Sequence, residues 1–230
     1  MNKLTIILGD THGEWNTVFY NIKQKDISNA TIIHVGDVGV GFKKSEKEEL
    51  EVLMKVNELL AERDIEMLAI KGNHDNPDYF NGSYRFSNLK LLADYTTLTL
   101  NGERFMFVGG AISIDRHLRT EGVDYWSGEK FQLNEDKIKG QKCDVLVTHT
   151  APKWLGPNSK GPIQWYLNQD KNLWEELEQE RQDMNYLYNR MQPKKFYCGH
   201  FHMRMEIMNE YTQARILNIH EMIEHFPCKK

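Results

Sequence analysis

The sequence predicts an α/β fold, and two observations lead to that prediction. Strand-like apolar runs alternate with amphipathic segments between residues 4 and 70, and this βαβαβ order is typical of parallel strands joined by right-handed crossovers. Five strand-like runs along the chain also end in short polar segments rich in Gly, Asp, Asn and His. Because ligands of open α/β sheets bind at the carboxyl ends of the strands, we expect these segments to form a common site.

The first half of the chain supplies the βαβαβ unit. The predicted strands span residues 4–8, 31–35 and 65–70, where short runs are rich in apolar and β-branched side chains. The predicted helices span residues 14–25 and about 45–63. Ser45 and Glu48 have the spacing of a capping box at the start of the second helix. His34 falls inside a strand and is interpreted as a hydrogen-bonded core residue.

The second half adds hairpins, further strands and a long helix. Hairpins are predicted at 96–108, with Asn101-Gly102 as the turn, and at 204–219. Strands are predicted at 144–147 and 195–198, and a helix from residue 170 to about 191. Proline and glycine residues between Pro152 and Gln169 predict an ordered surface loop. Trp126 would either line a substrate cleft or anchor its loop.

Length and composition favour a soluble, reduced, cytoplasmic protein. We expect a single domain covering residues 1–230, with two small domains as the alternative. The net charge of −4 gives no general attraction to nucleic acid or to an anionic membrane, and no apolar run reaches the length of a membrane span. The N-terminus lacks the cleavage site of a signal peptide. The three cysteines are far apart and suggest neither a disulfide framework nor a zinc ribbon.

The polar strand ends form a candidate metal-binding set. They present Asp10 and His12, Asp37, Asn73 and His74, His149, and His200 and His202. Each motif alone is also compatible with an ordinary polar turn or a core histidine. Together they offer only oxygen and imidazole ligands, which suit manganese, iron, zinc or nickel. The set exceeds what one cation needs, and two cations roughly 3.5–4 Å apart with a bridging carboxylate would use it.

The motifs that contain these residues resemble those of one superfamily. GDTHG at 9–13, GDVG at 36–39, GNHD at 72–75, THTAP at 148–152 and GHFH at 199–202 resemble, in that order, the calcineurin-like metallophosphoesterases. The resemblance covers about residues 3–219. It implies a four-layer α/β/β/α sandwich, in which two central mixed β-sheets are flanked by helices and a dinuclear metal site lies at the strand ends.

The resemblance also implies a role for each motif residue. One metal ion would be held by Asp10, His12 and His202, and the other by Asn73, His149 and His200. Asp37 would bridge the two ions, which are expected to be Mn²⁺, with Fe, Zn or Ni as alternatives. A hydroxide activated by both metals would be the nucleophile. His74 would protonate the leaving-group oxygen or stabilise the transition state, a role that suits an imidazole with a pKa near neutrality.

One motif departs from the pattern of the Ser/Thr protein phosphatases in this superfamily. Their second motif continues to an Asp-Arg-Gly, whereas here residues 36–42 read GDVGVGF. The aspartate that partners the catalytic histidine and the phosphate-gripping arginine are therefore missing from that position. Arg116 or Arg119, which follow the glycines at 109–110, is hypothesised to replace the arginine in a substrate-binding role. GNHD and GHFH resemble the broader, phosphodiesterase-rich branches.

The predicted function is hydrolysis of a small or nucleotide-type phosphodiester or phosphomonoester. Protein phosphatase and nuclease activities are the alternatives within the superfamily, although an acidic chain without a basic tract does not favour nucleic acid. A non-catalytic scaffold, like the retromer subunit of this superfamily, would lack metal ligands, and none is missing here. Specificity is expected to come from the loops at 115–130 and 155–169. The substrate, the ester class and the oligomeric state stay open.

Overall fold

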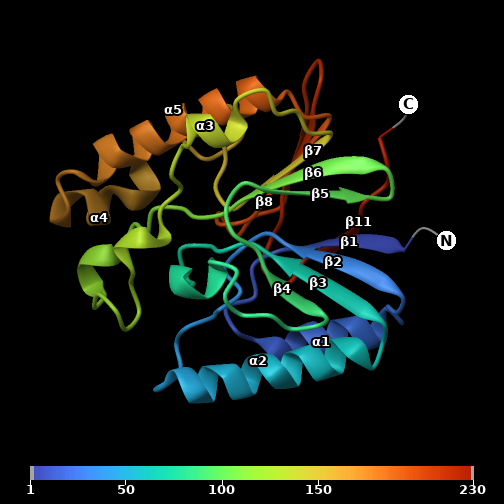
Figure 1. Ribbon diagram of the computed structural model, residues 1–230. Coiled ribbons are helices and arrows are strands. Elements are labelled where there is room, and N and C mark those ends of the chain that lie inside the picture. Colours follow the sequence, from blue (N-terminus) through green and yellow to red (C-terminus); the bar gives the residue numbers. More distant parts are fainter. Residues whose placement is uncertain (1–2, 229–230) are drawn as a thin grey trace.

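The computed structural model describes residues 3–228, which form two β-sheets packed face to face (Figure 1). The first sheet contains, in spatial order, β11 (Met222–Glu224), β1 (Leu4–Leu8), β2 (Ala30–His34), β3 (Ile65–Ala69) and β4 (Leu89–Leu91). The second contains β5 (Thr96–Leu100), β6 (Glu103–Val108), β7 (Val145–Thr148), β8 (Lys195–Cys198), β10 (Gln213–Ile216) and β9 (Met205–Met208). Both sheets are mixed, because β11, β5 and β9 run antiparallel to their neighbours.

Helices cover the outer face of each sheet. Helices α1 (Trp15–Gln24) and α2 (Glu46–Ala61) lie on the first sheet, and α3 (Glu135–Ile138) and α5 (Leu173–Met191) lie on the second (Figure 1). The short helix α4 (Gln164–Gln169) lies against α5 at the end of the sandwich away from both termini. The described residues also form four short 3₁₀ helices: η1 (Pro77–Phe80), η2 (Arg116–Leu118), η3 (Ser127–Glu129) and η4 (Gly161–Ile163). The expected four-layer α/β/β/α sandwich is confirmed.

The apolar side chains of the strands alternate between two buried layers. In β1, Ile6 and Leu8 pack toward α1 and α2, whereas Ile7 packs between the two sheets. Ile32 and Ile33 of β2 divide in the same way. Because both faces of these strands are covered, nearly every position is apolar, which is why the strands appear in the sequence as continuous hydrophobic runs.

The elements predicted from sequence are largely confirmed, and the differences concern the shortest elements and the start of the long helix. The stretch predicted as a loop before residue 170 contains η4 and α4, and the long helix begins at Leu173. The strands β4 and β11 and the helix α3 were not predicted. Helix α4 has six residues, α3 four and these strands three each, which is too short for a hydrophobic period to emerge.

Three local interpretations can also be compared with the structure. The Ser45 hydroxyl accepts a hydrogen bond from the Glu48 amide at 3.2 Å, as the capping box predicts. His34 is fully buried with its Nε2 2.9 Å from Thr11 Oγ1, so the core interpretation is confirmed. Trp126 is also buried and packs edge-on against Phe42, and it therefore anchors its loop.

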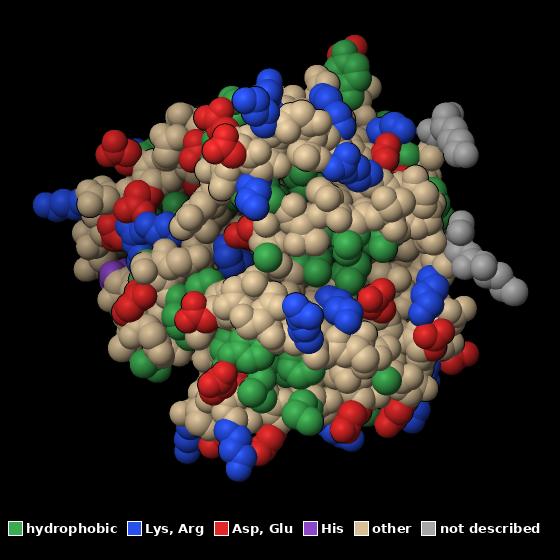
Figure 2. All heavy atoms as spheres, viewed as in Figure 1, with side chains coloured by type: hydrophobic (Ala, Val, Ile, Leu, Met, Phe, Trp, Pro, Cys, Tyr) green, Lys and Arg blue, Asp and Glu red, His purple; other side chains and the backbone are tan. Residues whose placement is uncertain are grey.

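The surface carries charges of both signs. On the face seen in Figure 2, Lys and Arg side chains are interspersed with Asp and Glu side chains. Within residues 3–228, no helix combines the length and the hydropathy of a membrane-spanning segment. Cys143 and Cys198 are buried, and all three cysteines carry free thiols.

Candidate metal centre

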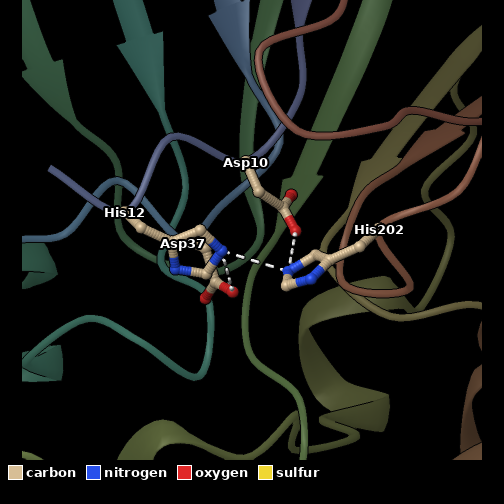
Figure 3. A group of neighbouring side chains, drawn as sticks. All are labelled: Asp10, His12, Asp37 and His202. Atoms are coloured by element: carbon tan, nitrogen blue, oxygen red, sulfur yellow. Dashed lines mark hydrogen bonds and ion pairs between the residues drawn. The ribbon is translucent and has the colours of Figure 1, made fainter. Parts of the chain in front are cut away.

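Four side chains from both sheets converge at one edge of the sandwich. Asp10 and His12 follow β1, Asp37 follows β2, and His202 follows β8. One ligand atom from each of the four lies within 4.8 Å of the others. His202 Nε2 is 3.3 Å from Asp10 Oδ2 and 3.0 Å from His12 Nε2, and Figure 3 shows these groups facing a common centre. This first cluster has the composition and spacing of a cation site.

A second cluster lies beside the first. Asn73, which follows β3, has its Oδ1 atom 3.1 Å from His149 Nε2 and 2.7 Å from His200 Nδ1. His149 follows β7, and His200 follows β8 two residues before His202. Amide oxygen and imidazole nitrogen are again ligands of divalent metals.

Asp37 stands between the two clusters. Its Oδ2 atom is 3.9 Å from His12 Nε2, and its Oδ1 atom is 3.1 Å from His149 Nε2. The carboxylate is almost completely buried, and the backbone N–H of His74 donates to Oδ1 at 2.7 Å. The two oxygens of one carboxylate therefore face two ligand sets, which is the arrangement of a bridging ligand.

Hydrogen bonds around the clusters orient the ligand atoms. His149 Nδ1 donates to the carbonyl oxygen of Val35 at 2.8 Å, and this bond orients the ring so that Nε2 points at Asn73 and Asp37. The side-chain amide of Asn73 donates to Ser113 Oγ at 3.0 Å, which turns Oδ1 toward the cluster. Asp10 Oδ1 is buried and has no hydrogen-bond partner among residues 3–228. A buried oxygen of this kind is costly unless a cation or a donor satisfies it, so the side chains fit divalent metal ions.

Backbone strain is concentrated in the same segments. His12, Asp37, His200 and His202 all have φ between +48° and +68°, in the left-handed region that non-glycine residues rarely adopt. Such conformations cost free energy and persist where the surrounding structure enforces them, often at functional sites. The tight turns direct successive side chains into one small volume.

Asp75, the last residue of GNHD, holds two of these turns together. Its carboxylate accepts hydrogen bonds from four backbone amides, those of Gly72, Val38, Gly39 and Val40, at 2.7–3.0 Å. These bonds join the turn after β3 to the turn after β2 and so fix Asn73 relative to Asp37. Neither Asp75 nor Ser113 received a role from the sequence, although the motif GNHD already contains Asp75.

Because Gly199 has no side chain, the Asp10 carboxylate can lie directly beside its Cα atom. A Cβ atom at residue 199 would lie 1.9 Å from Asp10 Oδ1, far inside contact distance. We expect Gly199→Ala to displace the carboxylate and lower Mn²⁺ affinity about 10- to 100-fold, the usual cost of disturbing a supporting shell. Isothermal titration calorimetry measures the affinity. Gly161→Ala is the control, because a Cβ there has 3.6 Å of clearance; equal Mn²⁺ affinity in both variants would contradict the prediction.

The groups around Asp37 favour its negatively charged form. Burial alone would raise the pKa of Asp37, but the adjacent His149 holds that pKa well below its usual range. Burial likewise opposes protonation of His149, but Asp37 raises the pKa of this imidazole to about 9. The Asp37 carboxylate therefore keeps its negative charge, and a cation at this position interacts favourably with it.

His74 lies beside the clusters with its ring toward the larger cavity. Burial lowers the pKa of His74 to about 4, with Asp37 acting in the opposite direction and Arg119 adding to the decrease. This pKa is lower than the near-neutral value expected from the sequence, so the His74 imidazole is neutral at pH 7 and can donate a hydrogen bond through its N–H. The two terminal nitrogens of Arg119 are 3.1 and 3.0 Å from the ring nitrogens of His74, and this guanidinium also pairs with Asp115 at 2.8 Å.

The two candidate arginines have different surroundings. Arg119 lines the cavity beside His74. Arg116 instead forms an ion pair with Asp170 at 2.7 Å and a two-pronged pair with Glu176 at 2.7 and 2.8 Å. The structure does not bring Arg116 into contact with the metal ligands; it joins η2 to the segment between α4 and α5.

Two cavities open beside the clusters. The larger, of about 380 Å³, is lined by Asp37, Asn73, His74, His200 and His202 at one end and by residues of η4, α4 and α5 at the other. The smaller, of about 190 Å³, is lined by His12 and His74 together with Gly39, Phe42 and Lys43. His74 lines both. The predicted specificity loops contribute Arg119 and the segment from Pro157 to Tyr166 to the larger cavity.

Glu180 of α5 is a buried carboxyl group behind the second cluster, with Thr150 Oγ1 as its side-chain partner at 3.4 Å. Burial raises its pKa to about 8, from an ordinary value of 4.5, although Thr150, His149 and Arg181 favour ionisation. At pH values between 4.5 and about 8, the Glu180 carboxyl group is ionised in the unfolded chain and protonated in the folded chain. Stability should therefore fall as pH rises from 5 to 8, by on the order of 3 kcal/mol from this group.

We expect Glu180→Gln to remove this part of the pH dependence, because an amide cannot ionise. Urea unfolding of the metal-stripped protein at pH 5.5, 7 and 8.5 measures it. Glu175→Gln, an exposed position of the same helix, is the control. Parallel pH curves for the wild type and Glu180→Gln would refute the assignment.

Comparisons with known proteins agree with this architecture. A family model described as calcineurin-like phosphoesterase matches residues 4–204. A dimetal phosphatase from Danio rerio is similar in structure, with 11% sequence identity and a TM-score of 0.53, over 95% of this chain and 88% of that chain. A phosphopantetheinyl hydrolase from Mycobacterium tuberculosis has 11% identity and a TM-score of 0.48 over 99% of this chain and 98% of that chain. A search of curated protein sequences found no significant match.

Proposed function

The chain belongs to the calcineurin-like phosphoesterases and is a hydrolase of phosphoric ester bonds, and we propose that it uses two divalent metal ions held between its sheets. The observation that carries the proposal is the position of Asp37. Its two carboxylate oxygens face different ligand sets, 3.9 Å from His12 and 3.1 Å from His149. A carboxylate that bound a single ion would not need a separate set of ligand residues beside each of its two oxygens.

In this proposal each ligand set holds one ion. Asp10, His12 and His202 would hold the first ion, Asn73, His149 and His200 would hold the second, and Asp37 would contribute to both. The donors are carboxylate, amide oxygen and imidazole without thiolate, and they support Mn²⁺, with Fe, Zn and Ni as candidates to compare. The ions supply Lewis acidity, which polarises the phosphoryl oxygens and acidifies a water molecule.

The chain's own residues position the reacting groups and stabilise the charge that develops on them. A water oxygen forms a bond to phosphorus while the bond from phosphorus to the ester oxygen breaks. His74, whose imidazole is neutral at pH 7, donates an N–H hydrogen bond to the departing oxygen, and this oxygen receives the proton that the attacking water loses. Arg119, beside His74, stabilises the negative charge that develops on the phosphoryl group. Water is the only co-reactant, and the products are an alcohol and a phosphate with one ester bond fewer.

Two cavities on either side of His74 support a phosphodiester as the preferred substrate. A diester carries two organic groups on its phosphorus, whereas a monoester needs only one cavity. The cavities of about 380 and 190 Å³ provide unequal room for two such groups. A polynucleotide substrate is disfavoured by the net charge of −4, because backbone recognition relies on clustered Lys and Arg, and on the face seen in Figure 2 these residues are interspersed with Asp and Glu. The free cysteines support a reducing, cytoplasmic environment.

The test is metal-dependent turnover by the metal-stripped protein. Bis(p-nitrophenyl) phosphate and p-nitrophenyl phosphate are compared before and after addition of Mn²⁺, Zn²⁺, Ni²⁺ or Fe²⁺. We expect negligible turnover without metal, restoration by Mn²⁺, and a higher kcat/KM for the diester. A preference for the monoester would overturn the diester assignment, and absence of turnover with two ions bound would overturn the proposed mechanism.

A further inference from the structure

We propose that the larger cavity binds an uncharged, ring-bearing ester group of the substrate. This inference rests on the proposed phosphoester hydrolysis and adds the chemistry of the group that the enzyme selects. Three features of the cavity lead to it: its apolar wall, the pairing of its charged side chains, and the fixed position of the segment that closes it.

The wall opposite the metal ligands is apolar and partly aromatic. It is formed by Ile163 at the end of η4, Tyr166 of α4 and Leu177 of α5, with Phe201 beside the ligand His200. The Phe201 and His200 rings pack edge to face with centroids 4.9 Å apart. A phosphate at the metal ligands would thus direct its organic group toward two aromatic rings and two aliphatic side chains. Flat apolar groups bind well in such surroundings.

The charged side chains in the cavity are already paired. Arg181 donates to Glu178 at 2.8 Å and to the carbonyl oxygen of Pro157 at 3.0 Å. Arg119 is paired with Asp115 and lies against His74, next to the metal ligands rather than at the far wall. A second anionic group on the substrate would therefore find no unpaired cation among the described residues of the far wall. This favours an ester group without charge.

The segment that closes the cavity is held in place from both sides. Arg116 pairs with Asp170 after α4 and with Glu176 of α5. The Trp174 ring of α5 also contacts two cations, Lys160 Nζ at 4.7 Å and Arg181 Cζ at 5.2 Å from the ring centroid. These contacts fix η4 and α4 against α5. A wall that is formed before the substrate arrives does not have to be ordered during binding, which increases affinity.

The smaller cavity has a different character. Its lining residues include Gly13, Gly39 and Lys43, with Phe42 as an apolar neighbour. Its volume is half that of the larger cavity, and a lysine is among its lining residues. A diester with one large apolar group and one small group would therefore have a preferred orientation in the site.

The test measures binding of phosphonates, which the enzyme does not hydrolyse, to the Mn²⁺-loaded protein. Phenylphosphonate, methylphosphonate and 4-carboxyphenylphosphonate share the metal-binding group and differ only in the organic part. By isothermal titration calorimetry we expect phenylphosphonate to bind at least about tenfold more tightly than methylphosphonate. The carboxylated probe should bind more weakly than phenylphosphonate. Because binding is measured rather than turnover, failure of this inference is separate from failure of the proposed chemistry.

Neighbouring variants on α4 locate the effect. Tyr166→Ala should reduce the preference for phenylphosphonate several-fold, while leaving methylphosphonate affinity unchanged. Trp165→Ala is the matched control, since this side chain is 54% exposed and does not line the cavity. Phe201→Ala provides a second variant from a different segment. Equal affinity for phenyl and methyl probes, tighter binding of the carboxylated probe, or a preference that survives both Tyr166→Ala and Phe201→Ala would each overturn the inference.

Discussion

Asp37→Asn should lower kcat/KM for bis(p-nitrophenyl) phosphate by about 10³-fold or more and reduce the number of bound Mn²⁺ ions. The substitution keeps the shape of the side chain and an oxygen that can accept the 2.7 Å hydrogen bond from the His74 amide. It removes the negative charge and one of the two oxygens that face His12 and His149. The fold should therefore persist while the dinuclear site fails.

The measurements are steady-state kinetics with added Mn²⁺ and metal content after desalting. Asp136→Asn, an exposed position in α3, is the control for a general effect of losing an acidic side chain. Retention of two Mn²⁺ ions and of wild-type kcat/KM by Asp37→Asn would show that this carboxylate does not bridge. Loss of one ion alone, with activity retained, would indicate a mononuclear enzyme.

His74→Gln should lower kcat by about 10²- to 10⁴-fold for a diester with a phenol leaving group, with both metal ions still bound. The decrease should be smaller when the leaving group is p-nitrophenol, because p-nitrophenolate is the weaker base and depends less on a hydrogen-bond donor. A purely structural role for His74 would affect both leaving groups equally. The comparison of bis(p-nitrophenyl) phosphate with diphenyl phosphate therefore isolates hydrogen-bond donation to the leaving group.

The control is His117→Gln, since this histidine is exposed and lies against Trp165 rather than against the metal ligands. Metal content must stay at the wild-type level in both variants. An equal loss of kcat for the two leaving groups would exclude a hydrogen bond from His74 to the leaving group and leave this residue a role in positioning Arg119.

The candidate ligand residues and the fold class could be predicted from the sequence, because both follow from local patterns. Asp10, Asp37 and Asn73 each come directly after a buried strand, so parallel strand order alone brings them to one edge. Ile6 and Leu8 are buried on one face of β1 and Ile7 on the other, so the strand is a continuous apolar run that can be recognised in the sequence. Pairing of individual oxygens and nitrogens depends on turns with positive φ, which only the three-dimensional structure describes.

Features that depend on packing between distant segments were not predictable in the same way. Arg116 and Arg119 were equivalent candidates in sequence, three residues apart on one loop. Only the approach of Asp170 and Glu176, more than 50 residues away, separates their roles. Helix α4 follows a proline-rich stretch and has no hydrophobic period of its own, so its place in the cavity wall was also missed.

The division of the ligands between the sheets has a consequence for synthesis on the ribosome. The nascent chain completes strands β1 to β4 before any strand of the second sheet exists, because residues 4–91 supply every strand of the first sheet except β11, and residues 96–216 supply the second sheet. Until the second half emerges, the inner face with Ile7, Ile33 and Leu68 has no covering layer. We therefore expect the nascent chain to need chaperone protection until β8 and β10 are made, and to acquire its full complement of metal only after release.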